Sequence, residues 1–167
     1  MEVSIRRVKR GDEHTLAYIQ TESWKAAFKD IVDPDTLSRC TEAEKATDMY
    51  RNLLNEDKGN GYILYLDNQP HCIAYWDAAR DEEFSGKAEL ICIHSLPDNW
   101  HKGYGEVMMQ KVLGDMEIAG FKEAVLWVFT DNKRARSFYE VNGFKATEYT
   151  KPCLGTEEIC YQKTLCS

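Results

Sequence analysis

Four residues, Lys102-Gly103-Tyr104-Gly105, stand directly before a stretch with apolar residues at helical spacing. A glycine-rich loop at a helix N-terminus leaves backbone N–H groups free where the helix dipole is positive, so it can bind a phosphate or pyrophosphate. A Walker loop is excluded because no Gly-Lys pair is followed by Ser or Thr, and a dinucleotide fingerprint is excluded because Met108 replaces its third glycine. A lone Gly-x-Gly leaves two interpretations open, an anion-binding loop and a plain structural turn.

Glu89 is a second residue whose chemistry its surroundings would change. It lies in the apolar run 88–95, whose isoleucines at alternate positions predict a largely buried strand. Desolvation raises the pKa of a buried carboxyl group, which suits a base that works near neutral pH. Two interpretations stay open, such a base and a solvated residue at the start of the strand. His94, expected to face the other way on this strand, is more typical of a packed, hydrogen-bonded histidine than of a base.

The elements around these residues follow from local patterns. Residues 88–95 predict a strand, 106–119 a helix that Gly120 ends, and 121–129 a further strand. Asp131 or Asn132 is expected to cap a helix that closes at Gly143. The glycine-rich loop therefore connects a buried strand to a helix.

The remaining segments predict further strands and helices on both sides of this unit. We expect a strand over 3–8, a helix from the cap Asp12 to about residue 28, and a helix from the capping box 41–44 to about residue 55. Residues 62–66 and 71–79 predict a hairpin, and the last strands are expected at 144–150 and 157–165, with 151–156 as a loop. This order predicts an α/β chain with one mixed sheet flanked by helices.

Composition limits the classes of function. The chain has 167 residues, of which 29% are charged and 43% hydrophobic, and we expect one domain over 1–167. Its net charge of -7 argues against nucleic acid and anionic membranes as partners. The apolar run 124–129 is too short to span a bilayer, and the N-terminus lacks the apolar core of a signal peptide, so we expect a cytoplasmic protein.

The cysteines do not predict a metal site. They stand at 40, 72, 92, 153, 160 and 166, without a Cys-x-x-Cys pair. Cys72 and Cys92 fall inside expected strands and are interpreted as small buried hydrophobic residues. Without a secretory signal we expect reduced thiols and no metal cofactor.

Two segments in this order resemble a known family. The Glu-Leu-x-x-Ile strand from Glu89, the pair Pro97-Asp98, the Lys-Gly-x-Gly loop and the helix after it resemble motif A of the GNAT superfamily, the acyl-CoA-dependent N-acetyltransferases. Residues 132–144 resemble the second motif of that family, Asn-x-x-Ala-x-x-x-Tyr-x-x-x-Gly-Phe. The resemblance implies the GNAT fold, a mixed sheet in which the parallel strands 88–95 and 122–129 splay apart. One position departs from the pattern, because Trp100 stands where the family has Gln or Arg; His101 or Lys102 would then supply the charge.

The resemblance implies acetyl-CoA as co-substrate, with its pantetheine in the splayed gap and its pyrophosphate on the amides of the loop. The residues expected to bind it are Ile93, His94, Ser95, His101, Lys102, Gly103, Tyr104, Gly105, Glu106, Asn132, Ala135 and Phe138.

The resemblance also implies catalytic roles. Glu89 matches the catalytic glutamate of histone-acetylating members in its place before the loop. Tyr139 matches the tyrosine that points at the CoA sulfur and would protonate the leaving thiolate; a core position is the alternative. A backbone N–H near Ser95 would stabilise the oxyanion. Asn132 would contact pantetheine, cap its helix, or do both.

The acceptor site is expected beside the first helix. Trp24, Phe28 and Trp76 would wall it, and Asp30 would recognise an ammonium group. The alternatives are that the aromatic residues belong to the core and that Asp30, with the acids near it, is a solvated loop residue.

Three functions stay open on the sequence. The first is direct acetyl transfer from acetyl-CoA to a primary amine of a small molecule or a protein. The second is a non-catalytic acyl-CoA-binding regulatory module, and the third is a transferase of the same fold that uses another acyl-CoA. A monomer and the homodimer common in this family both fit the sequence.

Overall fold

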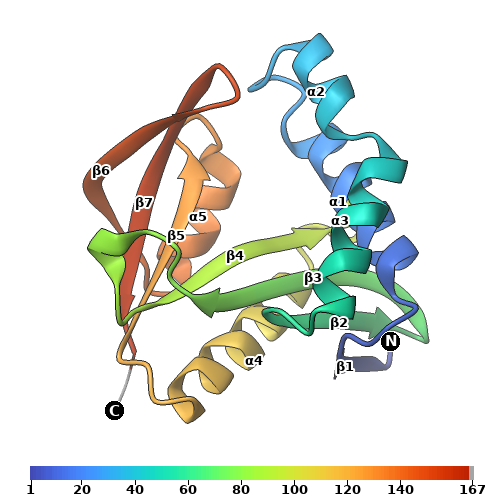
Figure 1. The fold of residues 1–167 in the computed structure, drawn as a ribbon, viewed down its shortest axis with the longest axis horizontal. Coiled ribbons are helices and arrows are strands. Elements are labelled where there is room, and N and C mark those ends of the chain that lie inside the picture. Colours follow the sequence, from blue (N-terminus) through green and yellow to red (C-terminus); the bar gives the residue numbers. More distant parts are fainter. Residues whose placement is uncertain (166–167) are drawn as a thin grey trace.

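One seven-stranded sheet runs through the computed structural model, which describes residues 1–165, in the order β1-β2-β3-β4-β5-β7-β6 (Figure 1). Its strands are β1 (Val3–Arg7), β2 (Asn60–Leu66), β3 (Gln69–Ala78), β4 (Ala88–Ser95), β5 (Glu123–Phe129), β6 (Lys145–Cys153) and β7 (Thr156–Thr164). The α-helices are α1 (Glu13–Ala27), α2 (Pro34–Cys40), α3 (Ala43–Asn55), α4 (Tyr104–Ile118) and α5 (Lys133–Val141). The expected mixed sheet flanked by helices is confirmed, because β4 and β5 are parallel and the other neighbours antiparallel.

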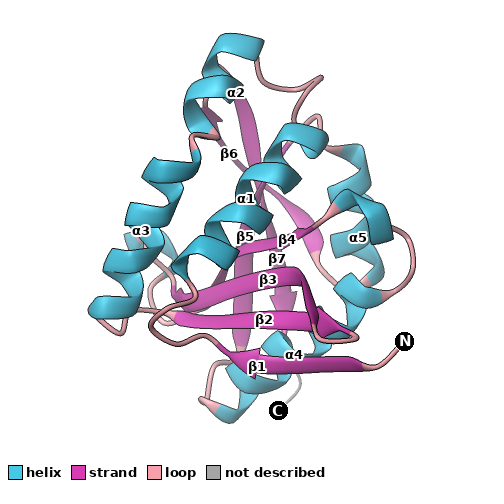
Figure 2. Cartoon of the chain, turned by 90° about the vertical axis from the view of Figure 1, so that its right-hand side faces the viewer, coloured by secondary structure: helices cyan, strands magenta, loops and turns pink. Residues whose placement is uncertain are grey.

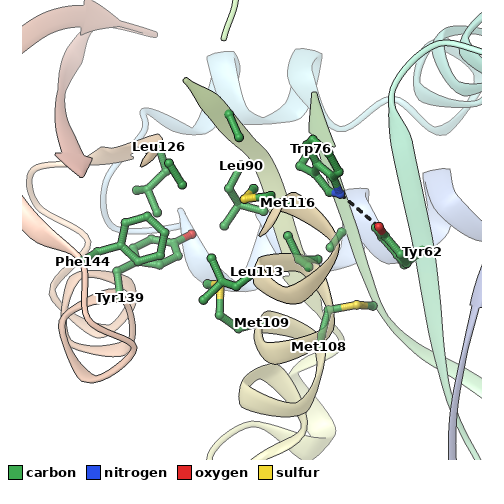
Figure 3. Packing of buried hydrophobic residues seen from close by; sticks show 14 of the residues in the cluster. Tyr62, Trp76, Leu90, Met108, Met109, Leu113, Met116, Leu126, Tyr139 and Phe144 are labelled. Atoms are coloured by element: carbon green, nitrogen blue, oxygen red, sulfur yellow. Dashed lines mark hydrogen bonds between the residues drawn. The ribbon is translucent and has the colours of Figure 1, made fainter. Parts of the chain in front are cut away.

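The helices form two layers. Helices α1 and α3 cover one face of β2, β3 and β4, whereas α4 lies on the opposite side of the sheet (Figure 2). Residues of α4 and α5 share the main apolar core with the strand residues beneath them. In that core Tyr139 and Phe144 lie on one side of α4, and Trp76 lies on the other, where its indole N–H donates to the Tyr62 hydroxyl at 3.0 Å (Figure 3). The sheet therefore separates this core from the side chains that pack beneath α1 and α3.

Strands β4 and β5 pair over a short stretch only. Residues 88–90 pair with 124–126, and beyond them the two strands separate. Ile91 is an extra residue in β4, because Tyr75 of β3 pairs with Cys92 and Trp76 with Leu90. The bulge bends β4 away from β5, which confirms the expected splaying of the parallel strands.

Two expected helix caps form differently. Asp12 precedes α1, but its carboxylate accepts from the Lys9 N–H and from the Arg6 guanidinium, both at 2.8 Å, and makes no cap bond. The expected capping box before α3 is absent among these described residues, because the Thr41 hydroxyl donates to the Leu37 carbonyl at 2.7 Å. In both places the polar side chain bonds to an earlier part of the chain and not to the first turn of the helix that follows it.

The last hairpin is longer than expected. The loop prediction for 151–156 is wrong, since β6 continues to Cys153 and the turn consists of Leu154 and Gly155, with φ of 50° and 81°. Pro152 is tolerated because β6 is an edge strand, where a missing N–H breaks no pairing on its outer side.

The described cysteines carry no disulfide. Cys72 is buried as expected, but Cys92 is only partly buried, because it borders a cavity. Cys166 lies outside the described residues. None of the helices within 1–165 has the length and apolar character that crossing a bilayer requires.

Candidate active site

A cavity of about 1190 Å³ lies where β4 and β5 separate. Its walls come from both layers, since α1, α3, β4, β5, α5 and the loop before α4 all contribute. Eleven of the residues expected to bind the co-substrate line it: Ile93, His94, Ser95, His101, Gly103, Tyr104, Gly105, Glu106, Asn132, Ala135 and Phe138. Lys102, the remaining one, is exposed and is not among the lining residues. The two sequence motifs therefore meet at one site.

The loop before α4 presents backbone N–H groups to this cavity. His101 and Gly103 have left-handed φ angles of 64° and 85°, and α4 begins at Tyr104. A Cβ on Gly103 would meet no atom within 4 Å, so glycine is needed there for its φ. A Cβ on Gly105 would lie 3.3 Å from the Phe138 ring, so glycine is needed there for the close approach of α4 and α5. The N–H groups of the first helical turn have no partner within the helix, and this geometry suits an anion.

Trp100 turns its ring toward α5. Its indole N–H donates to the Ser95 carbonyl at 3.0 Å, and the guanidinium carbon of Arg134 lies 3.7 Å from the centre of the Trp100 ring. Both side chains line the cavity. Arg134 was not predicted as a site residue; its signal in the sequence was a basic residue close behind the helix cap Asn132 in the second motif.

Asn132 holds the start of α5. Its side-chain oxygen accepts from the Ala135 N–H at 3.2 Å, which confirms the expected cap. Its side chain is buried and lines the cavity. The cap therefore lies beside the space where a ligand would bind.

Tyr139 reaches the cavity from α5. Its side chain is 9% exposed and packs against the rings of Phe138, Phe144 and Tyr161. Burial raises the pKa of its hydroxyl above the usual value, and the nearby Cys92 adds to that effect. The phenol keeps its proton at neutral pH, as a proton donor must, and the raised pKa makes it a weaker acid toward a thiolate than a solvated phenol.

Glu89 is buried but already paired. It is 1% exposed, so the interpretation as a solvated residue is wrong. Its carboxylate accepts from the Arg80 Nε at 3.1 Å, from the Arg80 Nη2 at 2.7 Å and from the Arg80 backbone N–H at 3.1 Å. Arg80 lines the cavity, whereas Glu89 does not. A base role for Glu89 would require Arg80 to move away.

His94 is also hydrogen-bonded. Its Nε2 accepts from the Trp24 indole N–H at 3.1 Å, and burial lowers the pKa of the imidazole to about 4. The ring is neutral at pH 7 and its Nε2 is occupied, which fits the expectation of a packed histidine. The expectation that His94 and Glu89 face opposite ways is wrong, because the bulge at Ile91 shifts the alternation by one residue.

The end of the cavity beside α1 is aromatic. Trp24 and Phe28 line it, their ring centroids 5.2 Å apart, and Phe28 packs at 4.9 Å on Phe129 of β5. Two carboxylates that were not predicted as site residues, Asp77 and Glu158, also line the cavity. Both residues lie in strands, β3 and β7, that are distant from the two motifs along the chain, so the motifs gave no signal for them.

Two expected acceptor residues lie elsewhere. Trp76 packs in the core on the α4 side of the sheet, so its assignment to the acceptor wall is corrected. The alternation of β3 predicts two faces but does not say which one meets the cavity. Asp30 is exposed and does not line the cavity, and Asp33 accepts from the Thr36 N–H at 3.0 Å as the cap of α2. For Asp30 and Asp33 the alternative interpretation, as loop residues outside the acceptor site, therefore fits the structure. Within residues 1–165, no three His, Cys, Asp or Glu side chains gather as metal ligands would.

Comparisons with known proteins agree with this geometry. The model of the acetyltransferase (GNAT) family matches residues 24–144. The spermidine N(1)-acetyltransferase of Thermoplasma acidophilum is 26% identical over 153 residues, which cover 89% of this chain and 91% of that protein. The solved PaiA N-acetyltransferase of T. acidophilum in complex with coenzyme A superposes with a TM-score of 0.85 at 21% identity, over 98% of this chain and 99% of that one.

A further solved structure with the same fold is an N-acetyltransferase named for a different acceptor. The ribosomal-protein-alanine N-acetyltransferase of Brucella melitensis superposes with a TM-score of 0.75 at 14% identity, over 97% of this chain and 99% of that one. At these sequence identities the solved structures show a shared fold alone, so membership of the family rests on the match to the family model. Because that model matches most of the chain, including both motifs and the cavity between them, the chain belongs to the GNAT family of acetyltransferases.

Proposed function

We propose that this acetyltransferase moves the acetyl group of acetyl-CoA directly to a primary amine of an aliphatic polyamine. The observation that carries the proposal is the cavity in the β4–β5 gap, which is lined both by the N-terminal residues of α4 and by the aromatic side chains of Trp24 and Phe28. The similarity to a spermidine acetyltransferase supports the choice of acceptor, as do the carboxylates of Asp77 and Glu158 in the cavity wall.

In this proposal the pantetheine of acetyl-CoA occupies the place of a missing strand. Its amides would pair with backbone groups of β4 near Ile93 and with the Ser95 N–H, beyond the last β4–β5 pair, while the Ser95 carbonyl keeps its bond to the Trp100 indole. The loop amides around Gly103 would bind the pyrophosphate. The acetyl group would then lie near the Ile91 bulge, within reach of the Tyr139 side chain in the cavity wall.

Transfer then requires three events. The neutral amine attacks the thioester carbonyl, and a backbone N–H near Ser95 stabilises the oxyanion. The C–S bond then breaks, and the leaving thiolate takes the proton of the Tyr139 hydroxyl. The attacking nitrogen releases its surplus proton to water, and water returns a proton to the Tyr139 phenolate, so the amide, free CoA and the starting tyrosine result. Trp24 and Phe28 would hold an alkyl ammonium group by cation–π contact before it loses its proton. We propose that Glu89 positions Arg80 in the cavity wall and that the amine loses its proton to water.

One sheet runs through the described residues and holds this cavity, so we propose a single domain. We also propose that it works in the cytoplasm, where acetyl-CoA is available. The first test is calorimetric binding of acetyl-CoA and CoA, with Gly103→Glu as a variant in which the added carboxylate repels the pyrophosphate. We expect binding in the wild type and its loss in the variant. Absence of binding to the wild type would overturn the proposal.

The second test is thiol release from acetyl-CoA with a panel of acceptors: spermidine, a diamine, a free amino acid, an aminoglycoside and a peptide with a free N-terminus. We expect the highest kcat/KM with spermidine, and lower values for Asp77→Asn and Glu158→Gln through a raised KM. Binding of acetyl-CoA without turnover of any acceptor would favour the regulatory module. Turnover with a longer acyl-CoA but not with acetyl-CoA would favour the transferase of another acyl group.

A further inference from the structure

The ring of Trp100 lies between the end of β4 and the start of α5. On one side its indole N–H donates to the Ser95 carbonyl at 3.0 Å. On its face lies the guanidinium of Arg134, at 3.7 Å from the ring centre, which is within the range of a cation–π contact. Trp100 thus holds an arginine of α5 beside the loop that precedes α4.

Arg134 differs from the other long cationic side chains of the cavity wall. Lys58 is 3.0 Å from the Glu56 carboxylate, and Arg80 is 2.7 Å from that of Glu89. Among the described residues, no carboxylate forms an ion pair with Arg134. Its positive charge is therefore available to an anion that enters the cavity, whereas the charges of Lys58 and Arg80 are already balanced.

The stacked geometry also leaves the donors of Arg134 accessible. A guanidinium that stacks on a ring uses its face, and its N–H groups point outward in its own plane. Those N–H groups match the oxygens of a phosphate, to which arginine donates two parallel hydrogen bonds. Stacking on Trp100 also fixes a side chain that would otherwise lose rotamer entropy on binding.

We propose that Trp100 and Arg134 form a composite phosphate-binding group, in which Trp100 positions the Arg134 guanidinium for a phosphate of the CoA co-substrate. The group replaces the Gln or Arg that motif A has at position 100. This inference rests on the proposed binding of acetyl-CoA. It adds that the cation comes from α5 and not from His101 or Lys102.

The test is calorimetric titration with CoA, 3′-dephospho-CoA and pantetheine. We expect Arg134→Gln to weaken CoA binding about 10- to 100-fold, the range for loss of a charge-assisted hydrogen bond, and to leave pantetheine binding unchanged. Lys133→Gln is the matched control, because it removes the same charge from the neighbouring exposed residue of α5. An equal loss for dephospho-CoA would assign Arg134 to the pyrophosphate, and a loss for CoA alone would assign it to the 3′-phosphate.

Trp100 variants test the coupling. Trp100→Ala should weaken CoA binding, and in the Arg134→Gln background the same change should add little, because the two side chains act as a unit. Trp100→Arg should restore CoA affinity to Arg134→Gln by returning the family cation. If Arg134→Gln binds CoA like Lys133→Gln, the inference is overturned while the proposed function stands. If the wild type binds neither CoA nor pantetheine, the proposed function itself fails.

Discussion

His94 shows how a single partly buried side chain links the acceptor end of the cavity to pH. Its imidazole accepts the indole N–H of Trp24, which fixes the ring that borders the cavity. Because burial lowers the pKa of His94 to about 4, protonation of this ring requires acid well outside the neutral range. The histidine therefore holds Trp24 in place at the pH where the enzyme would work.

The lowered pKa has a defined sign for stability. The folded-state value of about 4 lies below the ordinary histidine value, so the unfolded chain binds one more proton between about pH 4 and 6.5. Stability that is present above pH 6.5 is lost as the pH falls, by about 1.4 kcal/mol per unit for this group. We expect His94→Gln to flatten that slope in urea unfolding at several pH values. Parallel curves for both proteins would contradict the assignment.

Tyr139 allows a test of thiolate protonation. We expect Tyr139→Phe to lower kcat about 100-fold with little change in the KM for acetyl-CoA, because only the departing sulfur uses the hydroxyl. Tyr161→Phe is the matched control: its hydroxyl bonds to Arg136 and Glu140, and its side chain does not line the cavity. Steady-state rates from pH 6 to 9 check this expectation. Equal kcat values for Tyr139→Phe and the wild type would remove Tyr139 as the acid.

Variants of Glu89 and Arg80 distinguish two roles of Glu89, the positioning of Arg80 and action as a general base. Removal of Arg80 leaves the Glu89 carboxylate, whose side chain is 2% exposed, without its charged partner. We expect Arg80→Ala to destabilise the fold by about 2 kcal/mol, since the exposed side of Arg80 limits the loss, and Glu89→Gln to cost less.

The control for this pair is the double variant, which should be about as stable as Glu89→Gln, because no buried charge remains. Denaturant unfolding gives the stabilities, and the pH profile of kcat distinguishes the roles. A profile that Glu89→Gln leaves unchanged supports positioning. Loss of activity below pH 8 in that variant would establish Glu89 as the base.

At the scale of elements, the anion site depends on how closely α4 and α5 approach. A Cβ added to Gly105, in the first turn of α4, would lie 3.3 Å from the Phe138 ring, whereas a Cβ added to Gly114 in the same helix would have no atom within 4 Å. The two glycines of one helix therefore differ in what they allow. One permits a contact between elements, and the other only lowers the helix propensity.

Alanine at each position should separate these effects. We expect Gly114→Ala to stabilise the protein by up to about 1 kcal/mol without changing acetyl-CoA binding. Gly105→Ala should displace Phe138 and α5, and so weaken acetyl-CoA binding several-fold. Thermal unfolding and calorimetry check both variants. Equal affinities for the two variants would show that this contact does not shape the site.

For the whole molecule, the sheet consists of two parts joined by a short parallel pairing. Strands β1 to β4 form one part and β5, β7 and β6 the other, and within residues 1–165 the strand pairing between the two parts is limited to 88–90 with 124–126. We expect CoA to protect the β4 amides beyond Leu90 from hydrogen exchange, because its pantetheine would bond to them. Amides of β2, paired on both sides, are the internal control. Unchanged exchange along β4 at saturating CoA would contradict this expectation.

Local sequence patterns predicted the parts of this site that local forces determine. The bounds of β4, the cap Asn132 and the glycine loop follow from residues close together in the chain. The Ile91 bulge does not, because it depends on the register with β3. The face of Trp76 and the pairing of Glu89 with Arg80 likewise depend on which element packs against each side of the sheet, and no periodicity states that.

The separation of β4 and β5 has a consequence for the protein outside catalysis. Where the strands part, the β4–β5 pairing no longer occupies the facing backbone donors and acceptors, and a row of unpaired strand edge is a template for strand addition by another polypeptide. A bound co-substrate that fills the gap would shield them. Bound CoA would then raise the resistance of this protein to aggregation as well as permit its turnover.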